Sequence, residues 1–431
     1  MVCLARKTFD YEKALATYEE QQKKLRSIKE VDWTFIEGLT IEIEDAEKAI
    51  KKLSAADLDG LVIISGTFHL GHLALLLARE INRPVLLWAF SEPPYDGGKI
   101  RFNSACGVNL NASNLYKAGF KEFDYHLGDD MDESWLEAVR IRAALRQSRV
   151  GIIGSHAHGF YNMEPRALPY FHDFGALLIQ YQINEFYGEE VEEGRIREQE
   201  EKARTVFNCE GVSDEQIGKV ARLSASIRDF MKKRGLTAVA VRCWPEFADR
   251  YGIAPCAAMS LCQGDGLLTA CEGDVELALS MIVLRALGEK APFSADLSQV
   301  TPEDDTALLW HCGVAPYNLW DGKCVRSLDS YHAGGRGVTA DFVMQEGRFT
   351  VVRLDHALGD TRLLLGRGQA MAMDKLLKGT YARVRFDNHI EQVYEGLVMN
   401  GFAHHVAMGY GDYRNELLKF ARMMKLSEYE L

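Results

Sequence analysis

Apolar runs that alternate with helix-like stretches place the strongest constraint on how this chain folds. Residues 59–65 and 84–90 are apolar almost throughout, and residues 72–81 between them are helix-like. Continuous apolar runs are typical of strands that are covered on both faces. Because parallel strands need a crossover connection, usually a helix, this order predicts a parallel α/β sheet with right-handed crossovers.

The same alternation continues through the middle of the chain. Residues 134–147 and 214–234 are helix-like, and each is followed by a strand-like run, at 150–155 and 236–244. We therefore expect parallel sheets on both sides of residue 150.

The pattern changes after Pro316. Apolar and polar residues alternate on both sides of Glu346-Gly347, which predicts a hairpin, and residues 380–386 and 393–399 predict further strands. Several antiparallel strands without intervening helices favour a small β-barrel or a sandwich. An amphipathic helix is expected over residues 414–425.

The expected fold is therefore α/β, with two Rossmann-like parallel-sheet domains followed by a C-terminal antiparallel β-barrel domain. We place the N-terminal α/β domain at residues 1–150 and the central α/β domain at 151–290. The β-barrel domain, with its terminal helix, then occupies residues 291–431.

Charge and cysteine usage narrow the class of protein. The chain has 50 basic and 62 acidic residues, a net charge of −12, and no basic cluster, so neither nucleic acid nor an anionic membrane is an expected partner. The longest aliphatic run, at residues 73–78, is too short to span a bilayer, and the N-terminus lacks the apolar core of a signal peptide. Nine scattered cysteines without a C-x-x-C pair suit a reduced, cytoplasmic location.

The stretch from Cys271 to His311 has the strongest chemical pattern. Glu272 opens a helical stretch that Gly288 ends, and Asp296 comes soon after a strand start. A rigid element with a carboxylate near each end suits a hard metal ion or proton transfer. A capped helix followed by an aspartate in a loop explains the same residues.

Three further places carry polar side chains of interest. His156 and His158 follow a predicted strand and share one face, which suits either metal binding or a solvated loop. Glu246 ends another predicted strand. His404 and His405 lie in an apolar, Gly-bounded loop, where packing alone rarely calls for two imidazoles, because each buried ring needs hydrogen-bond partners.

Four motifs resemble the L-fucose isomerase and L-arabinose isomerase superfamily. They are C-E-G-D-V-E-L-A-L at 271–279, P-F-S-A-D-L at 292–297, D-D-T-A-L-L-W-H-C-G at 304–313 and G-F-A-H-H-V at 401–406. Their order is that of the superfamily. The resemblance is specific over the last third of the chain and looser upstream.

This resemblance implies that Glu272 and Asp296 bind a divalent metal, Mn²⁺ or Mg²⁺, and serve as the catalytic acids and bases. A histidine of the C-terminal pair joins them. By position His405 is that ligand, with His404 as the open alternative. His311 is similar to a further metal-binding histidine of the arabinose-type enzymes.

The resemblance also implies the reaction. We expect a metal-dependent aldose–ketose isomerase that converts a pentose, a 6-deoxyhexose or a 6-substituted hexose through an enediol intermediate. Another enediolate-forming epimerase or lyase, or a sugar-binding relative without catalysis, remains an alternative. Members form homo-oligomers in which a neighbour's N-terminal domain closes the active site, so we expect His69 and Trp88 of that domain to contact substrate. We also expect His404 and Glu246 to contact substrate.

The chain is shorter than typical members of that superfamily, so fewer loops enclose the far end of the sugar. That end can therefore carry a different substituent, including an anionic one such as a sulfonate. Arg101, Arg166 and Arg336 lie in predicted loops that can face such a group, and a solvated surface position explains each of them equally.

Overall fold

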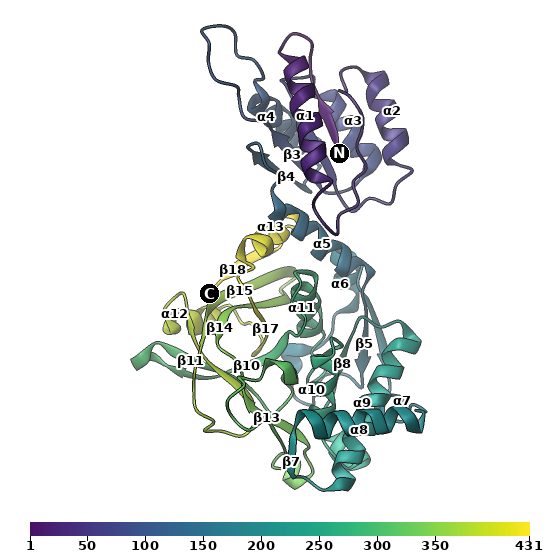
Figure 1. The fold of residues 1–431 in the computed structure, drawn as a ribbon, viewed down its shortest axis with the longest axis vertical. Helices are drawn as coiled ribbons and strands as arrows, with labels where there is room; N and C mark the ends of the chain where they lie inside the picture. Colours follow the sequence, from purple (N-terminus) through teal and green to yellow (C-terminus); the bar gives the residue numbers. More distant parts are fainter. The chain divides into compact units, whose positions relative to one another are not determined.

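The computed structural model describes residues 1–431 (Figure 1). The chain divides into two compact units. Unit 1 consists of Met1–Arg140 and Leu418–Lys425, and unit 2 of Ile141–Leu417 and Leu426–Leu431. No helix is both long and apolar enough to cross a membrane.

Unit 1 contains a four-stranded parallel sheet in the order β1-β2-β3-β4. Its strands are β1 (Val2–Leu4), β2 (Leu61–Ser65), β3 (Val85–Ala89) and β4 (Phe123–Leu127), and its helices are α1 (Tyr11–Leu25), α2 (Ile43–Leu53), α3 (His72–Ile81) and α4 (Ser104–Lys117). Every residue of β2 and β3 is buried. The predicted strand–helix–strand order and the parallel pairing are confirmed here.

Unit 2 holds a second four-stranded parallel sheet, in the order β6-β5-β8-β9. Its strands are β5 (Arg149–Ile153), β6 (Leu177–Tyr181), β8 (Ala238–Val241) and β9 (Leu268–Ala270). The associated helices are α6 (Ala167–Phe174), α7 (Ile183–Tyr187), α8 (Glu193–Val206), α9 (Asp214–Arg234), α10 (Cys256–Gly264) and α11 (Val275–Ala286). Helix α5 (Glu133–Gln147) crosses the boundary between the units.

The third sheet has ten strands and is mostly antiparallel, in the order β18-β15-β14-β17-β10-β11-β16-β13-β12-β7. The strands are β7 (Asn208–Gly211), β10 (Phe293–Thr301), β11 (Thr306–His311), β12 (Ser327–Asp329), β13 (Thr339–Val343), β14 (Gly347–Ala357), β15 (Asp360–Met371), β16 (Thr380–Phe386), β17 (His405–Tyr410) and β18 (Ser427–Glu430). Strand β15 pairs with β14 and also with β16 and β18. Two helices lie in the C-terminal part of the sequence, α12 (Ile390–Met399) and α13 (Arg414–Met424), and α13, like α5, crosses the boundary between the units.

The predicted hairpin around Glu346-Gly347 is wrong. Strands β13 and β14 flank this dipeptide, but β13 pairs with β12 and β16, whereas β14 pairs with β15 and β17. The hairpin of β14 is made with β15 through Leu358 and Gly359, which both have positive φ. A local turn signal does not decide which strands pair, because burial over the whole sheet sets the pairing.

The strand predicted at 393–399 is also wrong, because this segment belongs to helix α12. Ile390 and Val393, three residues apart, are its buried side chains, and the His389 ring accepts a hydrogen bond from the Glu391 backbone N–H at the helix start. Periodicity does not separate strand from helix over so short an apolar run.

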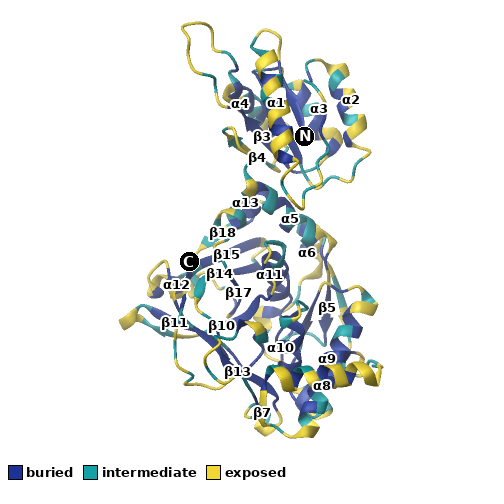
Figure 2. Ribbon diagram, viewed as in Figure 1, coloured by how far each residue is buried: buried dark blue, intermediate teal, exposed yellow.

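Helix α11, the helical stretch predicted after Glu272, lies inside the protein. Every residue from Val275 to Leu284 is buried, and Figure 2 shows the helix among buried strands. Its N-cap is Asp274, which accepts a hydrogen bond from the Leu277 backbone N–H at 2.9 Å. The helix ends at Ala286, just before Gly288 with its left-handed φ of 90°.

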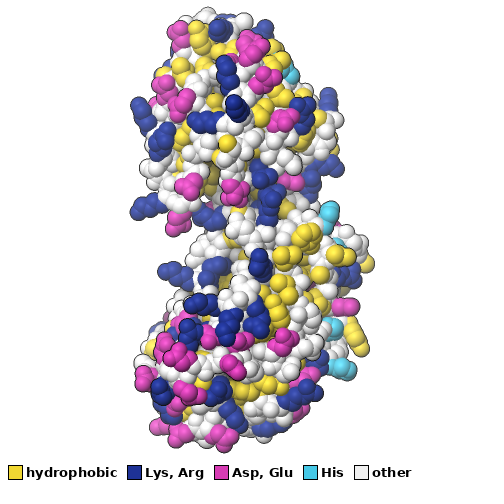
Figure 3. All heavy atoms as spheres, turned by 90° about the vertical axis from the view of Figure 1, so that its right-hand side faces the viewer, with side chains coloured by type: hydrophobic (Ala, Val, Ile, Leu, Met, Phe, Trp, Pro, Cys, Tyr) yellow, Lys and Arg dark blue, Asp and Glu magenta, His cyan; other side chains and the backbone are white.

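The surface carries charges of both signs. On the face shown in Figure 3, Lys and Arg side chains are interspersed with Asp and Glu side chains. This face shows no continuous row of basic side chains that could follow the backbone of a nucleic acid, in keeping with the net charge of −12.

Candidate active site

The register of three neighbouring strands brings the predicted histidines and aspartate together. Strand β10 lies between β17 and β11, and Asp296 is directly opposite His405 on β17 and Trp310 on β11. Nε2 of His405 lies 3.3 Å from Oδ1 of Asp296. The ring of His311, at the end of β11, stacks on that of His405 with 5.6 Å between centroids.

Glu272 reaches the same point from the loop between β9 and α11. Its Oε2 lies 3.4 Å from Nε2 of His405, and its Oε1 accepts a hydrogen bond from the Trp244 indole at 3.2 Å. Glu272 has a left-handed backbone, with φ at 59°. The next residue must be glycine, because a Cβ on Gly273 would lie 2.0 Å from the Ser155 carbonyl oxygen. The left-handed backbone of Glu272 is strained because this residue is not glycine, and such strain is a recurrent feature of functional sites.

Asp274 fixes the orientation of the His405 ring. Its Oδ2 lies 3.0 Å from Nδ1 of His405, and both side chains are fully buried. Since a carboxylate only accepts, Nδ1 carries the proton and Nε2 presents its lone pair toward Glu272 and Asp296. Asp274 is thus both the cap of α11 and the partner that sets the tautomer of His405.

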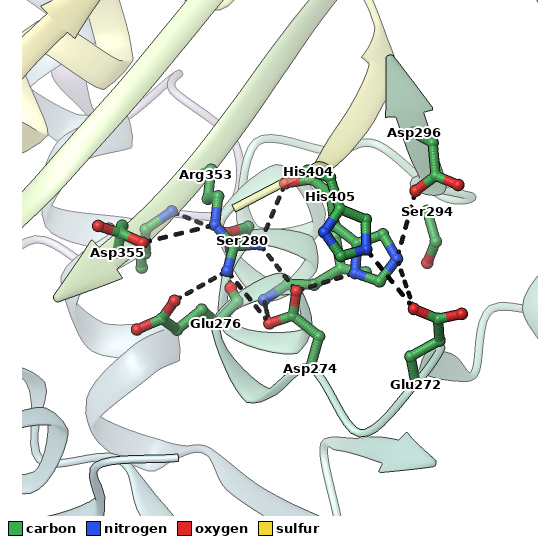
Figure 4. A network of polar contacts seen from close by, with 12 residues as sticks. Glu272, Asp274, Glu276, Ser280, Ser294, Asp296, Arg353, Asp355, His404 and His405 are labelled. Atoms are coloured by element: carbon green, nitrogen blue, oxygen red, sulfur yellow. Dashed lines mark hydrogen bonds and ion pairs between the residues drawn. The ribbon is translucent and has the colours of Figure 1, made fainter. Parts of the chain in front are cut away.

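A buried arginine of β14, Arg353, contacts both members of this pair (Figure 4). Nη1 of Arg353 lies 2.8 Å from Oδ2 of Asp274 and donates to the His405 carbonyl at 3.0 Å, while Nη2 lies 2.8 Å from Oε2 of Glu276. The Tyr170 hydroxyl donates to the other oxygen of Glu276. A fully buried guanidinium is stable only when carboxylates compensate its charge, so these contacts hold one fixed arrangement.

The carboxylates differ in their acidity. Burial by itself would raise the pKa of Asp274, but the adjacent Arg353 guanidinium and the hydrogen bond from His405 hold it well below its usual range. Burial dominates for Glu276 and raises its pKa to about 7. For Glu272, burial is outweighed by its contact with His404 and by the electrostatic attraction of the His405 and His311 rings, so its pKa is lowered.

The donor atoms at the centre fit a divalent metal ion. Oδ1 of Asp296, Nε2 of His311 and Nε2 of His405 are buried and have no hydrogen-bond partner, although nearly all buried polar atoms in proteins have one. Ligand atoms of Asp296, His311 and His405 lie within 4.8 Å of one another, as do those of Glu272, His404 and His405. Carboxylate oxygens with imidazole nitrogens suit Mn²⁺ or Mg²⁺ better than a thiolate-preferring ion.

A cavity of about 360 Å³ opens beside these atoms, within the size range of small-molecule sites. Glu272, Asp296 and His311 line one part of it. The remaining lining residues are mostly apolar, apart from two with basic side chains: Cys243, Trp244, Pro245, Ala248, Ala254, Trp310, Cys312, His332, Ala333 and Arg336.

His404 and Glu246 also lie in unit 2, with different surroundings. The side chain of His404 is 41% exposed, its Nε2 is 3.6 Å from Oε2 of Glu272, and its ring packs edge-on against Phe160. Glu246 forms an ion pair with Arg242 at 2.5 Å and is not among the residues that line the cavity.

His69 and Trp88 belong to unit 1, and both are fully buried. The His69 ring contacts the Thr67 carbonyl and the Asn111 side chain, and the Trp88 indole donates to the Gly128 carbonyl. Their part in substrate binding stays a prediction.

Sequence patterns missed Asp274, Arg353 and Trp244. One available signal was Arg353 itself, a lone cation within the apolar run F-T-V-V-R-L. A charged side chain in a buried strand needs charged partners, which indicates an internal network.

Two family models match the chain. The N-terminal domain of fucose/sulfoquinovose isomerase matches residues 1–133, and the C-terminal domain of L-fucose isomerase matches residues 324–430. The chain is similar over nearly its whole length to curated proteins named sulfoquinovose isomerase. The protein of Priestia aryabhattai is 28% identical over 438 residues, covering 99% of this chain and 97% of the relative. That of Alkalicoccus urumqiensis is 26% identical, covering 99% and 98%, and that of Clostridium sp. (strain MSTE9) is 27% identical, covering 97% and 96%.

Proposed function

Because the chain belongs to the fucose isomerase-like family of aldose–ketose sugar isomerases, we propose that it converts sulfoquinovose, a glucose with a sulfonate at C6, into the corresponding 2-ketose. The observation that carries this proposal is the convergence of Glu272, Asp296, His311 and His405 beside one cavity. The relatives named sulfoquinovose isomerase support the choice of sugar.

We assign a divalent cation, Mn²⁺ or Mg²⁺, to Glu272, Asp296, His311 and His405. When bound, such a cation stabilises the negative charge of an enediolate. His405 is preferred over its neighbour because Asp274 directs its lone pair into the site. His404 is more exposed, its Nε2 lies 3.6 Å from Oε2 of Glu272, and its ring is available to a sugar hydroxyl.

The reaction needs two proton transfers, one from C2 to C1 and one from O2 to O1. The two carboxylates divide these transfers between them. Asp296 would hold the cation through Oδ1, which has no hydrogen-bond partner, and its other carboxylate oxygen accepts the proton from C2 and returns it to C1. Glu272, with one oxygen held by Trp244, moves the hydroxyl proton from O2 to O1. No electron leaves the sugar, so no redox cofactor is required.

The apolar wall of the cavity protects the intermediate. Trp244, Pro245 and Trp310 line the space next to the two carboxylates. Low water content around the carboxylates strengthens their electrostatic contacts with the sugar and limits side reactions of the enediolate.

Two structural proposals accompany this function. The pairings β15-β14-β17-β10-β11-β16, together with β15–β16, support closure of these six strands as a β-barrel. We also propose a homo-oligomer in which unit 1 of a neighbouring subunit completes the site, as the family resemblance implies.

A substrate panel tests the proposed function. The protein, loaded with Mn²⁺ or Mg²⁺, is incubated with sulfoquinovose, 6-deoxyglucose, L-fucose and L-arabinose, and products are identified by ¹³C NMR after chelation. We expect the 2-ketose from sulfoquinovose at the highest kcat/KM. Formation of only the C2 epimer, or of carbon–carbon cleavage products, would show a different reaction.

A further inference from the structure

One arginine lies on the cavity that holds the proposed catalytic carboxylates. Of the three arginines that sequence analysis placed in loops, Arg101 belongs to unit 1 and is bound to the Asp10 carboxylate. Arg166 precedes helix α6 and does not line the cavity. Arg336 lines the cavity and is the only Lys or Arg that does so.

The turn that carries Arg336 is held firmly. Ala333 has a left-handed φ of 51°, and the two following glycines are left-handed as well. The Arg336 carbonyl accepts from the Ala254 backbone N–H at 3.2 Å, and the His332 carbonyl accepts from the Gly337 N–H at 2.7 Å. A Cβ on Gly337 would lie 2.5 Å from Cβ of His332, so the turn closes tightly on itself. The side chains of Arg336 and His332 therefore start from a defined backbone.

The guanidinium of Arg336 is oriented by acceptors but keeps donors available. Its Nε donates to the Ala333 carbonyl at 3.3 Å, and its Nη1 donates to the Ala248 carbonyl at 3.1 Å and lies 2.9 Å from Oδ1 of Asp249. These contacts involve Nε and Nη1 and do not involve Nη2. The side chain is 51% exposed, so Nη2 is accessible to a ligand, and arginine is well suited to bind tetrahedral oxyanions.

The charges around the cavity are separated. Glu272 and Asp296 make the metal end acidic, and a divalent cation held there is balanced by these two carboxylates, so this end offers no excess positive charge to an anionic group. Arg336 supplies positive charge to the cavity lining, and His332, which also lines the cavity, supplies an imidazole. A sugar that places C1 and C2 at the carboxylates therefore meets favourable charge for an anionic C6 group only toward Arg336.

We propose that Arg336 and His332 form the subsite for the anionic C6 substituent of the sugar. This assignment rests on the proposed function, and it makes Arg336 the residue that distinguishes a 6-sulfonated or 6-phosphorylated sugar from a neutral one. Asp249 competes with the ligand for the guanidinium and thereby limits the affinity for the anion.

The experiment compares kcat/KM for sulfoquinovose, glucose 6-phosphate and neutral 6-deoxyglucose in the metal-loaded protein. The variants are Arg336→Gln, Arg336→Lys and Asp249→Asn. The matched control is Arg197→Gln, an exposed arginine of helix α8 that is not among the cavity residues. Binding of the 6-sulfo hexitol, which cannot isomerise, and of the neutral hexitol is measured separately by calorimetry.

We expect Arg336→Gln to lower the sulfoquinovose to 6-deoxyglucose ratio of kcat/KM by about 10- to 100-fold, mainly through KM, as for loss of a charge-assisted hydrogen bond. Arg336→Lys should restore part of that ratio, and Asp249→Asn should raise it. The control should leave the ratio within about twofold, the scale of surface substitutions. A larger loss with glucose 6-phosphate than with sulfoquinovose would assign the subsite to phosphate.

An unchanged ratio in Arg336→Gln, with unchanged binding of the 6-sulfo hexitol, would overturn the assignment. This outcome is distinguishable from failure of the proposed function. If no aldose is isomerised, the hexitol measurement still decides whether an anion binds at Arg336.

Discussion

Nδ1 of His405 lies 3.0 Å from Oδ2 of Asp274, and neither side chain is exposed. This contact connects the N-terminus of helix α11 to strand β17 and sets which ring nitrogen faces Glu272 and Asp296. Carboxylates that orient a metal-binding histidine typically account for 10- to 100-fold in metal affinity, or roughly 1.4–2.8 kcal/mol. The geometry therefore makes Asp274 a positioning residue.

The first prediction concerns Asp274→Asn. The asparagine can still cap α11, but its amide lets the His405 ring adopt either tautomer, so Mn²⁺ affinity measured by calorimetry should fall by about 10- to 100-fold. Glu276→Gln is the matched control, because Glu276 contacts the same Arg353 without contacting His405. Equal losses in the two variants would mean that the buried charge network, rather than the histidine contact, controls metal binding.

The second prediction follows from the pKa of Glu276, which burial raises from 4.5 to about 7. A carboxyl whose pKa is higher in the folded than in the unfolded protein stabilises the folded state at pH values below its unfolded pKa. This contribution is lost as the pH rises toward 7. The Tm of the wild-type protein minus that of Glu276→Gln should therefore fall between pH 4.5 and 8 in metal-free protein. A difference that stays constant or rises over this range would contradict the assigned shift.

The third prediction concerns the two carboxylates. Glu272→Gln and Asp296→Asn are nearly isosteric and should each lower turnover by about 10²- to 10⁴-fold, the usual contribution of general acid–base groups. The apo-protein Tm should stay close to that of the wild type. Glu303→Gln, an exposed carboxylate beyond the end of β10, serves as the control. Retention of more than about a tenth of the rate by either site variant would remove it from the proton transfers.

The fourth prediction concerns assembly. We expect light scattering to give a mass that is a multiple of the 48.4 kDa chain, because the family resemblance implies a site completed by a neighbouring subunit. Dilution into the monomer range should reduce turnover together with the mass. Full activity of a monomer would contradict this arrangement.

Local pattern was enough to predict much of the secondary structure. The runs at 59–65 and 84–90 are buried parallel strands, and the helices at 72–81 and 214–234 begin and end where periodicity and caps predict. The segment at 393–399 failed because an apolar run of this length fits strand and helix alike.

The site shows the same division between local and long-range information. Motifs named Glu272, Asp296, His311 and His405, and the structure brings these four side chains together. The pairing of Asp296 with His405 depends on the register of β10 and β17, which lie far apart in the sequence. The burial of Arg353 likewise depends on packing that no local pattern records.

The most direct test of the account follows sulfoquinovose in D₂O with the metal-loaded wild-type protein, using ¹³C NMR after chelation of the paramagnetic ion. We predict that the 2-ketose accumulates with deuterium at C1, because a carboxylate that carries the proton from C2 to C1 exchanges with solvent. Its formation should stop in protein stripped of metal and resume when Mn²⁺ is restored. Absence of ketose with metal-loaded protein, or undiminished conversion after metal removal verified by elemental analysis, would contradict the account.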